Sequence, residues 1–288
     1  MHNSKITLGL PVLNGERYIH EALRSIFKQT FKNFDLIIYD NCSTDKTLSI
    51  CKKYQKKHNI RIYKQKKRVG AVENFLSVLK KADSKFFLFV CHDDIFKEKQ
   101  YLKNLIEKIS NNTIPFGTTN IINNKSCNLK HLCNNIAHNY AGPAIYRRLK
   151  FFLTPLITGR NNIIYGIHER KHLLNVFKFM IKAKYRKCYK YLKTNIEDNY
   201  LNYMILKEKK ICFVPNVTLL KRVRQEEIKT NFFNTKKNNI KIFLDIFNSL
   251  LTFIKFSNFF EAIIIFMLIP VYIVYERYLI FLFFLKNK

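Results

Sequence analysis

Residues 86–96 read FFLFVCHDDIF, an apolar run that ends on two adjacent carboxylates, Asp93 and Asp94. A short apolar run of this kind is typical of a strand that is buried on both faces, as in a parallel sheet. Paired carboxylates at its end could hold a divalent cation, which prefers carboxylate oxygens and shares its other coordination sites with phosphate. Alternatively, one acid caps the next helix and the other is solvated. The stretch therefore predicts a buried strand with polar chemistry at its carboxyl end.

The same alternation of short β-rich runs and amphipathic stretches extends over the first 110 residues. Such alternation indicates βαβ units and predicts an α/β fold with a mostly parallel central sheet flanked by helices. The predicted strands are Ile6–Leu13, Phe34–Asp40, Ile60–Lys64 and Phe86–Cys91. The predicted helices begin near Glu16, Asp45, Gly70 and Glu98.

Ligands of open parallel sheets bind beyond the carboxyl ends of the strands, so the polar loops at these ends should form one crevice. The loops are Pro11–Glu16, Asp40–Asp45 and His92–Phe96. In the second loop, Asp40 beside Asn41 could accept an N–H of a nucleotide base, or could form an Asx turn. Two Lys and an Arg precede Gly70, where a helix N-terminus could bind phosphate. A solvated basic turn is the alternative there.

The charge of the chain is strongly positive: 51 Lys and Arg stand against 20 Asp and Glu, a formal net charge of +31. The excess favours anionic partners such as lipid head groups, phosphates and nucleotides. Nucleic acid is not expected, because the crowding of Asn and Ile beside Lys indicates a compositional bias. Seven scattered cysteines without a C-x-x-C pair indicate a reducing compartment and argue against a zinc site.

The second half of the chain is less regular. Residues 111–160 are rich in Asn with scattered Gly and Pro, which predicts long loops. A second ordered region is predicted over residues 161–222, where NIEDNYLNYMIL indicates a helix that opens on Glu197 and Asp198. The N-terminal residues lack the apolar core of a secretory signal, so the globular part is expected in the cytoplasm.

From Ile240 the sequence becomes more apolar. Residues 240–255 place polar and apolar side chains on opposite faces, as in an amphipathic helix, and residues 262–275 carry no charge. This uncharged run is shorter than the roughly 20 residues of a spanning helix. Three arrangements stay open: a helical pair packed on the core, association with a membrane surface, and a true span. The basic composition favours the membrane surface.

Five segments of the chain resemble glycosyltransferase family 2, the inverting enzymes of GT-A fold. They run from ITLGLPVLNG through IYDNCSTDKT and RVGAVENF to FFLFVCHDDIF, in the order and spacing of the family, and the later Glu-Asp pair follows. The resemblance is strong over residues 5–110 and looser over 161–224. Where many relatives begin the D-x-D motif with an acid, this chain has Cys91, and His92-Asp93-Asp94 resembles a subgroup with that variant.

The resemblance implies roles for individual residues. Asp93 would bind Mg²⁺ or Mn²⁺, and Asp198 would be the catalytic base, with Glu197 as the second choice. The residues implied in binding the nucleotide sugar are Pro11, Val12, Glu16, Asp40, Asn41, Arg68, Gly70, Asn74, Asp94, Arg222 and Arg224. The implied domains are a GT-A domain over residues 1–235, with a nucleotide-binding half to about 110 and an acceptor half after it, and a membrane-associating tail over 236–288.

We therefore expect an inverting, metal-dependent glycosyltransferase that uses a nucleotide-diphosphate sugar. Its acceptor would be a glycan or a lipid-linked glycan, assembled into cell-surface polysaccharide at the cytoplasmic face of the membrane. The alternative is a basic, membrane-associated binding protein whose GT-A scaffold no longer catalyses transfer. Replacement of the first acid of the motif by Cys91 is the feature that favours this alternative.

Overall fold

The computed structural model describes residues 5–110, 112–124, 142–153, 160–184, 196–222, 259–268, 270–271 and 274. Elements of the first half are β1 (Ile6–Val12), α1 (Ile19–Phe27), β2 (Phe34–Asp40), α2 (Thr47–Gln55), β3 (Ile60–Lys64), α3 (Ala71–Lys81), β4 (Phe86–Phe89), β5 (Ile95–Phe96) and α4 (Tyr101–Ile106). Elements of the second half are β6 (Thr113–Ile122), α5 (Ala144–Leu153), the 3-10 helix η2 (Arg160–Tyr165), β7 (His168–Glu169), α6 (Arg170–Lys184), α7 (Ile196–Glu208) and β8 (Lys210–Arg222).

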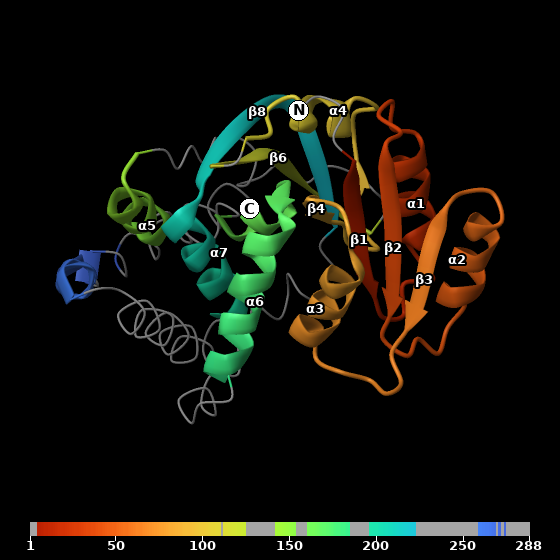
Figure 1. The fold of residues 1–288 in the computed structure, drawn as a ribbon, viewed down its shortest axis with the longest axis horizontal. Coiled ribbons are helices and arrows are strands. Elements are labelled where there is room, and N and C mark those ends of the chain that lie inside the picture. Colours follow the sequence, from red (N-terminus) through yellow and green to blue (C-terminus); the bar gives the residue numbers. More distant parts are fainter. Residues whose placement is uncertain are drawn as a thin grey trace, which may run out of the picture.

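The central sheet has five strands in the order β3-β2-β1-β4-β7, and only β7 runs antiparallel to its neighbour among these described strands. Side chains alternate across the sheet with the period of two that a strand requires. Leu8 of β1 packs in the core beneath α1, whereas Phe87 and Phe89 of β4 pack in the core beneath α3. The mostly parallel α/β sheet flanked by helices is thus confirmed (Figure 1).

The predicted strands match the observed ones closely, but β4 ends at Phe89 rather than Cys91. The reason lies in the neighbouring strand. Gly9 of β1 accepts a hydrogen bond from the backbone N–H of Val90, and the next residue of β1 that faces β4 is Pro11. Proline has no N–H to continue the ladder. Residues 91–94 are therefore released from the sheet and form the loop that carries the acids.

The long loops predicted over residues 111–160 are wrong where the chain is described, because this region contains β6 and α5. Strand β6 includes Pro115 and Gly117, two residue types that are uncommon inside strands. In the structure, β6 is an edge strand of a second sheet with the order β5-β8-β6, and an edge tolerates proline. The register shifts between Phe116 and Thr118, and a Cβ on Gly117 would overlap the carbonyl oxygen of Val217. Because Gly117 has no Cβ, the backbones of β6 and β8 can approach closely at this shift in register.

The second sheet starts directly after the acidic loop. Ile95 and Phe96 of β5 pair antiparallel with Leu220 and Leu219 of β8. The acidic loop is therefore held between two sheets, with β4 before it and β5 after it. This arrangement explains how Arg222, the last residue of β8, contacts Asp94, although the two residues are 128 positions apart in the sequence.

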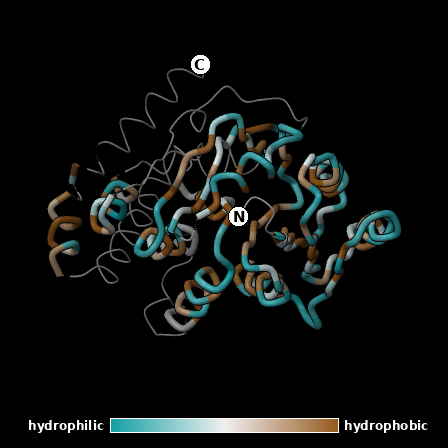
Figure 2. Tube along the Cα trace, turned by 45° about the horizontal axis from the view of Figure 1, so that its top comes forward, coloured by the Kyte–Doolittle hydropathy of each residue, from teal (hydrophilic) through white to brown (hydrophobic). Residues whose placement is uncertain are grey.

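The predicted C-terminal helix is present over residues 259–268, and the amphipathic stretch predicted over 240–255 lies outside the described residues. Glu261 is fully buried and pairs with the guanidinium of Arg148, while its second oxygen accepts a 3.1 Å hydrogen bond from the hydroxyl of Tyr203. The described residues of this segment are mostly hydrophobic (Figure 2), and Phe259, Phe260, Phe266 and Met267 among them are exposed. Within the described residues, no helix combines the length and apolarity needed to cross a bilayer.

Candidate functional site

Hydrogen bonds connect the loop after β1 with the loop after β2 at the carboxyl edge of the central sheet. The backbone N–H of Asn14 donates to the Ser43 hydroxyl at 2.9 Å, and the Asn14 side-chain oxygen accepts from the Thr44 N–H at 2.9 Å. The N–H of Gly15 donates to the Thr47 hydroxyl at 2.8 Å. Asn14 has a φ of 51°, a left-handed conformation that Asn tolerates better than most residues. The loops that were predicted to converge do so.

Asp40 stands at the carboxyl end of β2 with its side chain fully buried. Its Oδ2 accepts a 3.0 Å hydrogen bond from the backbone N–H of Ser43, which is the Asx turn considered above. Its Oδ1 is buried and has no hydrogen-bond partner. A buried acceptor without a donor is costly, so the vacant Oδ1 suits a ligand that brings an N–H. The Asx turn and the base-binding prediction are therefore compatible.

Asn41 fixes the third loop. Its side-chain amide donates to the carbonyl of Val69 at 2.8 Å and accepts from the Val69 N–H at 2.9 Å. This reciprocal pair places Arg68 and Gly70 beside the end of β2. Arg68 is exposed, and Gly70 is the residue before the first turn of α3, with a φ of −65° that other residues also adopt. Gly70 is thus at a helix N-terminus, as predicted for phosphate binding.

Asn74 lies on α3 and is buried. Its amide donates to the Tyr39 carbonyl at 3.3 Å and accepts from the Gln65 amide at 3.2 Å. These bonds tie the helix to β2 and to the chain that leaves β3. The observed contacts give Asn74 a supporting role in the crevice wall, and its predicted contact with the nucleotide stays a prediction.

Glu16, Pro11 and Val12 belong to the wall formed by β1 and the loop after it. The Glu16 carboxylate accepts from the Lys46 N–H at 3.0 Å, and its own N–H donates to the Asp45 carboxylate at 3.0 Å. Pro11 and Val12 are buried in β1. Glu16 thus holds the first loop against the second, whereas Pro11 and Val12 pair with Tyr39 and Asp40 of β2.

Cys91, Asp93 and Asp94 form a compact cluster in the acidic loop. One ligand atom from each residue, a thiol sulfur and two carboxylate oxygens, lies within 4.8 Å of the others. Asp94 is 2% exposed, and its Oδ2 is buried without a hydrogen-bond partner. A divalent cation would satisfy this oxygen and offset the repulsion of the two neighbouring carboxylates, and these two carboxylates by themselves fit a hard cation such as Mg²⁺ or Mn²⁺.

The ionisation of the cluster reflects its crowding. Burial raises the pKa of Asp94 to about 7, and the neighbouring Asp93 carboxylate adds to this rise, against the cationic Lys221. Burial also raises the pKa of the Cys91 thiol well above its usual value, with further contributions from Asp94 and Asp93. Without a cation, negative charge is therefore disfavoured in this loop.

Arg222 locks the loop from the side of β8. Its side chain has no exposed surface, and its guanidinium donates to the Glu21 carboxylate at 2.9 Å and to the carbonyls of Asn123 at 2.7 Å and Asp93 at 3.3 Å. Its backbone N–H donates to Asp94 Oδ1 at 3.2 Å. These contacts hold the backbone of the acidic loop, whereas the predicted contact of Arg222 with a diphosphate stays a prediction.

The predicted base lies on a confirmed helix. Glu197 and Asp198 are the second and third residues of α7, as the sequence indicated, and their side chains lie outside the described part of the structure. Arg224 also lies outside the described residues. The helix packs against η2, whose last residue Tyr165 contacts Cys91 through its hydroxyl, 3.4 Å from the sulfur.

Sequence reasoning missed Glu21, Tyr165 and His92 as parts of the site. Gly15 brings the first loop so close to His92 that a Cβ there would be 2.7 Å from the imidazole. Glu21 is the partner of Arg222, and Tyr165 is the neighbour of Cys91. No local pattern marks Glu21 or Tyr165, because each meets its partner across long sequence separations.

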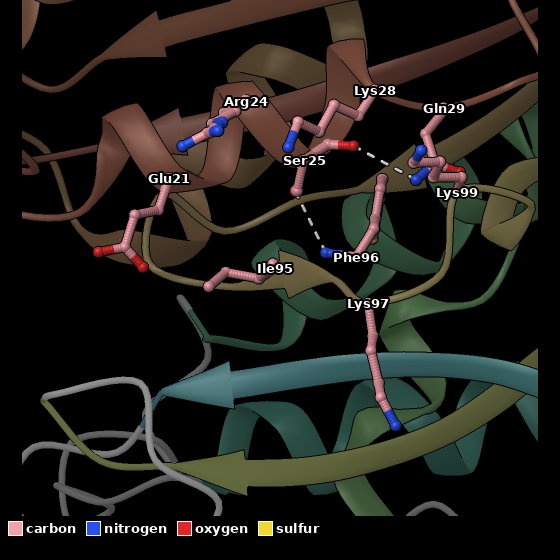
Figure 3. A pocket seen from close by; sticks show the side chains of 9 residues that line it. All are labelled: Glu21, Arg24, Ser25, Lys28, Gln29, Ile95, Phe96, Lys97 and Lys99. Atoms are coloured by element: carbon pink, nitrogen blue, oxygen red, sulfur yellow. Dashed lines mark hydrogen bonds between the residues drawn. The ribbon is translucent and has the colours of Figure 1, made fainter.

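A cavity of about 380 Å³ adjoins the site along α1 and β5 (Figure 3). It is lined by Glu21, Arg24, Ser25, Lys28, Gln29, Ile95, Phe96, Lys97 and Lys99. Hydrogen bonds fix its floor, since the Ser25 hydroxyl accepts from the Phe96 N–H at 3.2 Å. None of the predicted site residues lines this cavity. It lies beside the crevice at the strand ends and is not the predicted nucleotide site.

Residues 7–170 match the family described as Glycosyl transferase family 2. A dolichyl N-acetyl-alpha-D-glucosaminyl phosphate 3-beta-D-2,3-diacetamido-2,3-dideoxy-beta-D-glucuronosyltransferase from Methanococcus voltae is 40% identical over 108 residues, 35% of this chain and 33% of the relative. Poly(ribitol-phosphate) beta-N-acetylglucosaminyltransferase TarS from Staphylococcus aureus is 38% identical over 103 residues, 35% of this chain and 18% of the relative. The matched stretches thus span a third or less of these curated relatives.

Solved structures of S. aureus TarS share the fold. The complex of residues 1–349 with UDP-GlcNAc superposes with a TM-score of 0.57 at 23% identity, covering 86% of this chain and 66% of that one. The complex with UDP has a TM-score of 0.55 at 23% identity, covering 88% and 72%. These likenesses show that the chain shares the mixed α/β GT-A fold of TarS.

Proposed function

Because the chain belongs to glycosyl transferase family 2, we propose that it transfers a sugar from a nucleotide-diphosphate sugar to an acceptor hydroxyl, with inversion at the anomeric carbon. The observation that carries this proposal is the pair of unsatisfied buried carboxylate oxygens, Asp40 Oδ1 at the carboxyl end of β2 and Asp94 Oδ2 in the loop after β4. One oxygen is suited to a base N–H and the other to a cation. A nucleotide diphosphate with a divalent metal brings both groups.

The donor end of the proposal rests on three connected loops. Asp40 would accept from the base, and Asn41 holds the Val69–Gly70 segment beside it. The exposed Arg68 and the N-terminus of α3 would then face the anionic diphosphate. The TarS structures with UDP and UDP-GlcNAc support a uridine diphosphate sugar as the first donor class to examine.

A bound Mg²⁺ or Mn²⁺ would neutralise charge that develops on the departing diphosphate. Asp93 and Asp94 would hold it, as the orphaned Asp94 Oδ2 supports. Arg222 contributes by fixing the loop backbone, since it binds the carbonyl of Asp93 and the carboxylate of Asp94 through separate groups. The acids would therefore be positioned before the donor arrives.

Asp198 is the proposed base, with Glu197 as the second choice. The acceptor oxygen would form a bond to the anomeric carbon while the bond from this carbon to the diphosphate oxygen breaks, and the hydroxyl proton would pass to the carboxylate. Attack from the face opposite the leaving group inverts the configuration. The location of both acids in the first turn of α7 favours their ionised form through the helix dipole.

We propose a glycan or lipid-linked glycan as the acceptor and the cytoplasmic face of the cell membrane as the location. The support is the exposed apolar surface of the C-terminal segment. There Phe259 and Phe260 are 75% and 73% exposed, while Glu261 between the segment and the core is fully buried. A segment anchored on one side and apolar on the other suits insertion into a lipid surface. The net charge of +31 would add attraction to anionic lipids.

The donor proposal is tested by the melting temperature of the full chain with a panel of nucleotide diphosphates and nucleotide sugars, with and without Mn²⁺. A ligand that binds only the folded state raises the melting temperature. We expect one nucleotide class to produce a metal-dependent rise that is lost in Asp93→Asn. Glu107→Gln, at an exposed carboxylate that directly follows α4, should keep it.

Absence of any nucleotide-dependent rise in wild type would contradict the donor proposal. It would favour the alternative of a basic binding protein that has lost transfer activity. That alternative has a separate readout, because binding of nucleic acid falls steeply with salt, whereas nucleotide-sugar binding should depend chiefly on the metal.

A further inference from the structure

The thiol of Cys91 lies in the acidic loop, next to the carboxylates of Asp93 and Asp94. Its sulfur lies within 4.8 Å of carboxylate oxygens from both Asp93 and Asp94. This distance allows the three atoms to surround one cation, since metal–sulfur and metal–oxygen bonds are about 2.3 Å and 2.0–2.2 Å long in zinc sites. The release of residues 91–94 from the sheet at Pro11 creates this loop.

The Asp94 carboxylate is divided between two tasks. Its Oδ1 is held by the backbone N–H of Arg222 at 3.2 Å, whereas Oδ2 is buried with no hydrogen-bond partner. The side chain as a whole is 2% exposed, so bulk water does not solvate this oxygen. Asp94 belongs to the cluster that contains the Cys91 sulfur, so a cation held by the cluster would offer this oxygen a partner.

Two groups near Cys91, Tyr165 and Lys221, favour a thiolate and would support it once a cation offsets the charge of the two carboxylates. The Tyr165 hydroxyl is 3.4 Å from the sulfur and could donate to it, as outer groups of metal sites do. The ammonium of Lys221 lies 5.1 Å from the centre of the Tyr165 ring and interacts with Asp94 and Cys91. A thiolate and two carboxylates together carry three negative charges. A divalent cation and Lys221 balance them.

We propose that Cys91 Sγ is a direct metal ligand, which makes this a mixed sulfur–oxygen site that selects thiophilic divalent cations such as Co²⁺, Zn²⁺ and Cd²⁺ over Mg²⁺. On binding, the S–H bond breaks, a sulfur–metal bond forms, and the thiol proton leaves to solvent. Soft sulfur ligands favour such metals, whereas an all-oxygen set suits Mg²⁺. The inference rests on the proposed function in one respect, that the acidic loop holds a metal at all.

The test is a Co²⁺ titration of the full chain, followed by the sulfur-to-metal charge-transfer absorbance in the near ultraviolet. We expect a band in wild type and in Cys212→Ser, a second partly exposed cysteine on β8. The band should be absent in Cys91→Ser and Cys91→Asp. Calorimetric affinity for Cd²⁺ should fall by more than about tenfold in Cys91→Ser, because loss of even an outer partner costs 10–100-fold.

The preference between metals gives a second readout that does not depend on activity. Cys91→Asp should bind Mg²⁺ more tightly than wild type and Cd²⁺ less tightly, because it replaces sulfur by oxygen. Retention of the Co²⁺ band in Cys91→Ser, or Cd²⁺ binding that is lost in Asp93→Asn yet unchanged in Cys91→Ser, would overturn the role of Cys91 and leave the metal site intact. Absence of binding of every metal would overturn both proposals.

Discussion

The guanidinium of Arg222 and the carboxylate of Glu21 are joined by a 2.9 Å ion pair that connects the end of β8 to the first turn of α1. The arginine side chain has no exposed surface, whereas the glutamate side chain is 46% exposed. The same guanidinium lies 4.2 Å from the centre of the Tyr18 ring. The second sheet is thereby fastened to the central sheet directly beside the acidic loop.

Replacement of Arg222 should destabilise the protein more than replacement of its partner. Arg222→Met leaves the carbonyls of Asn123 and Asp93 without their donor, and we expect a loss of about 3 kcal/mol in the free energy of unfolding. Glu21→Gln should cost less than Arg222→Met, because the amide oxygen still accepts a hydrogen bond from the buried guanidinium and only the charge of its partner is lost. Urea denaturation of both variants measures the difference, and equal losses would contradict it.

The buried imidazole of His168 should make stability depend on pH. Burial lowers its pKa to about 3, and the nearby His172 adds to this shift. The pKa of this histidine in the unfolded chain is about 6.5, so between pH 6.5 and 3 the unfolded chain binds a proton and the folded chain does not. The free energy of unfolding therefore falls as the pH falls from 6.5 towards 3. Between pH 6.5 and 4.5 we expect this group to account for a loss of about 2–3 kcal/mol.

His168→Gln, which can keep a donor to the Ile163 carbonyl, should remove this part of the pH dependence. The exposed His20, changed to Gln, serves as the matched control and should leave the dependence as in wild type. Urea denaturation at pH 7 and 4.5 gives the comparison. An unchanged pH dependence in His168→Gln would show that the imidazole is protonated in the folded protein or contributes nothing.

Gly117 should be intolerant of even a methyl group. A Cβ at this position would overlap the carbonyl oxygen and the side chain of Val217, which belong to the facing strand β8. We expect Gly117→Ala to lower stability by about 1–3 kcal/mol, in the range for overpacking a rigid contact. Gly70→Ala is the control. Its Cβ would meet only the movable Glu73 carboxylate, and its φ of −65° suits alanine, so its change should be within about 1 kcal/mol.

Much of the fold could be predicted because its signal is local. The strands β2 and β3 have the predicted bounds, since each is a short run rich in the β-branched and aromatic residues that favour strands. The strand β6 was missed because the Asn-rich region that contains it, with scattered Gly and Pro, is typical of loops, and β6 itself includes Pro115 and Gly117. Only the edge position of β6 and the close approach of Val217 explain their presence in a strand.

The candidate site, like the fold, could be predicted where its signal is local. The acids and polar residues at strand ends were found because each loop follows a recognisable strand. Glu21 and Arg222 are 201 residues apart in sequence, and nothing near either residue indicates their contact. Likewise, the sequence marks Cys91 only as a departure from the first acid of the D-x-D motif. Its place in the cluster emerges only from the folded loop and from Tyr165 beside it.

The exposed apolar side chains of the C-terminal segment should contribute to membrane association. Replacing Phe259, Phe260, Phe266 and Met267 by Ser should reduce co-sedimentation with anionic phospholipid vesicles by more than about tenfold, because each buried CH₂ group contributes about 0.8 kcal/mol to lipid binding. Phe179→Ser, at a 46% exposed side chain on α6, is the control and should bind like wild type. Unchanged binding by the fourfold variant would rule out this surface.

The central claim is glycosyl transfer by this crevice, and the most direct measurement is release of nucleotide diphosphate from a donor panel in the presence of Mn²⁺ and a glycan acceptor. Wild type should release the nucleotide and form a product of inverted anomeric configuration. Asp198→Asn should lose release by at least about 100-fold, the lower range for a general base, while keeping the donor-induced rise in melting temperature. Release that persists in both Asp198→Asn and Asp93→Asn would contradict the account.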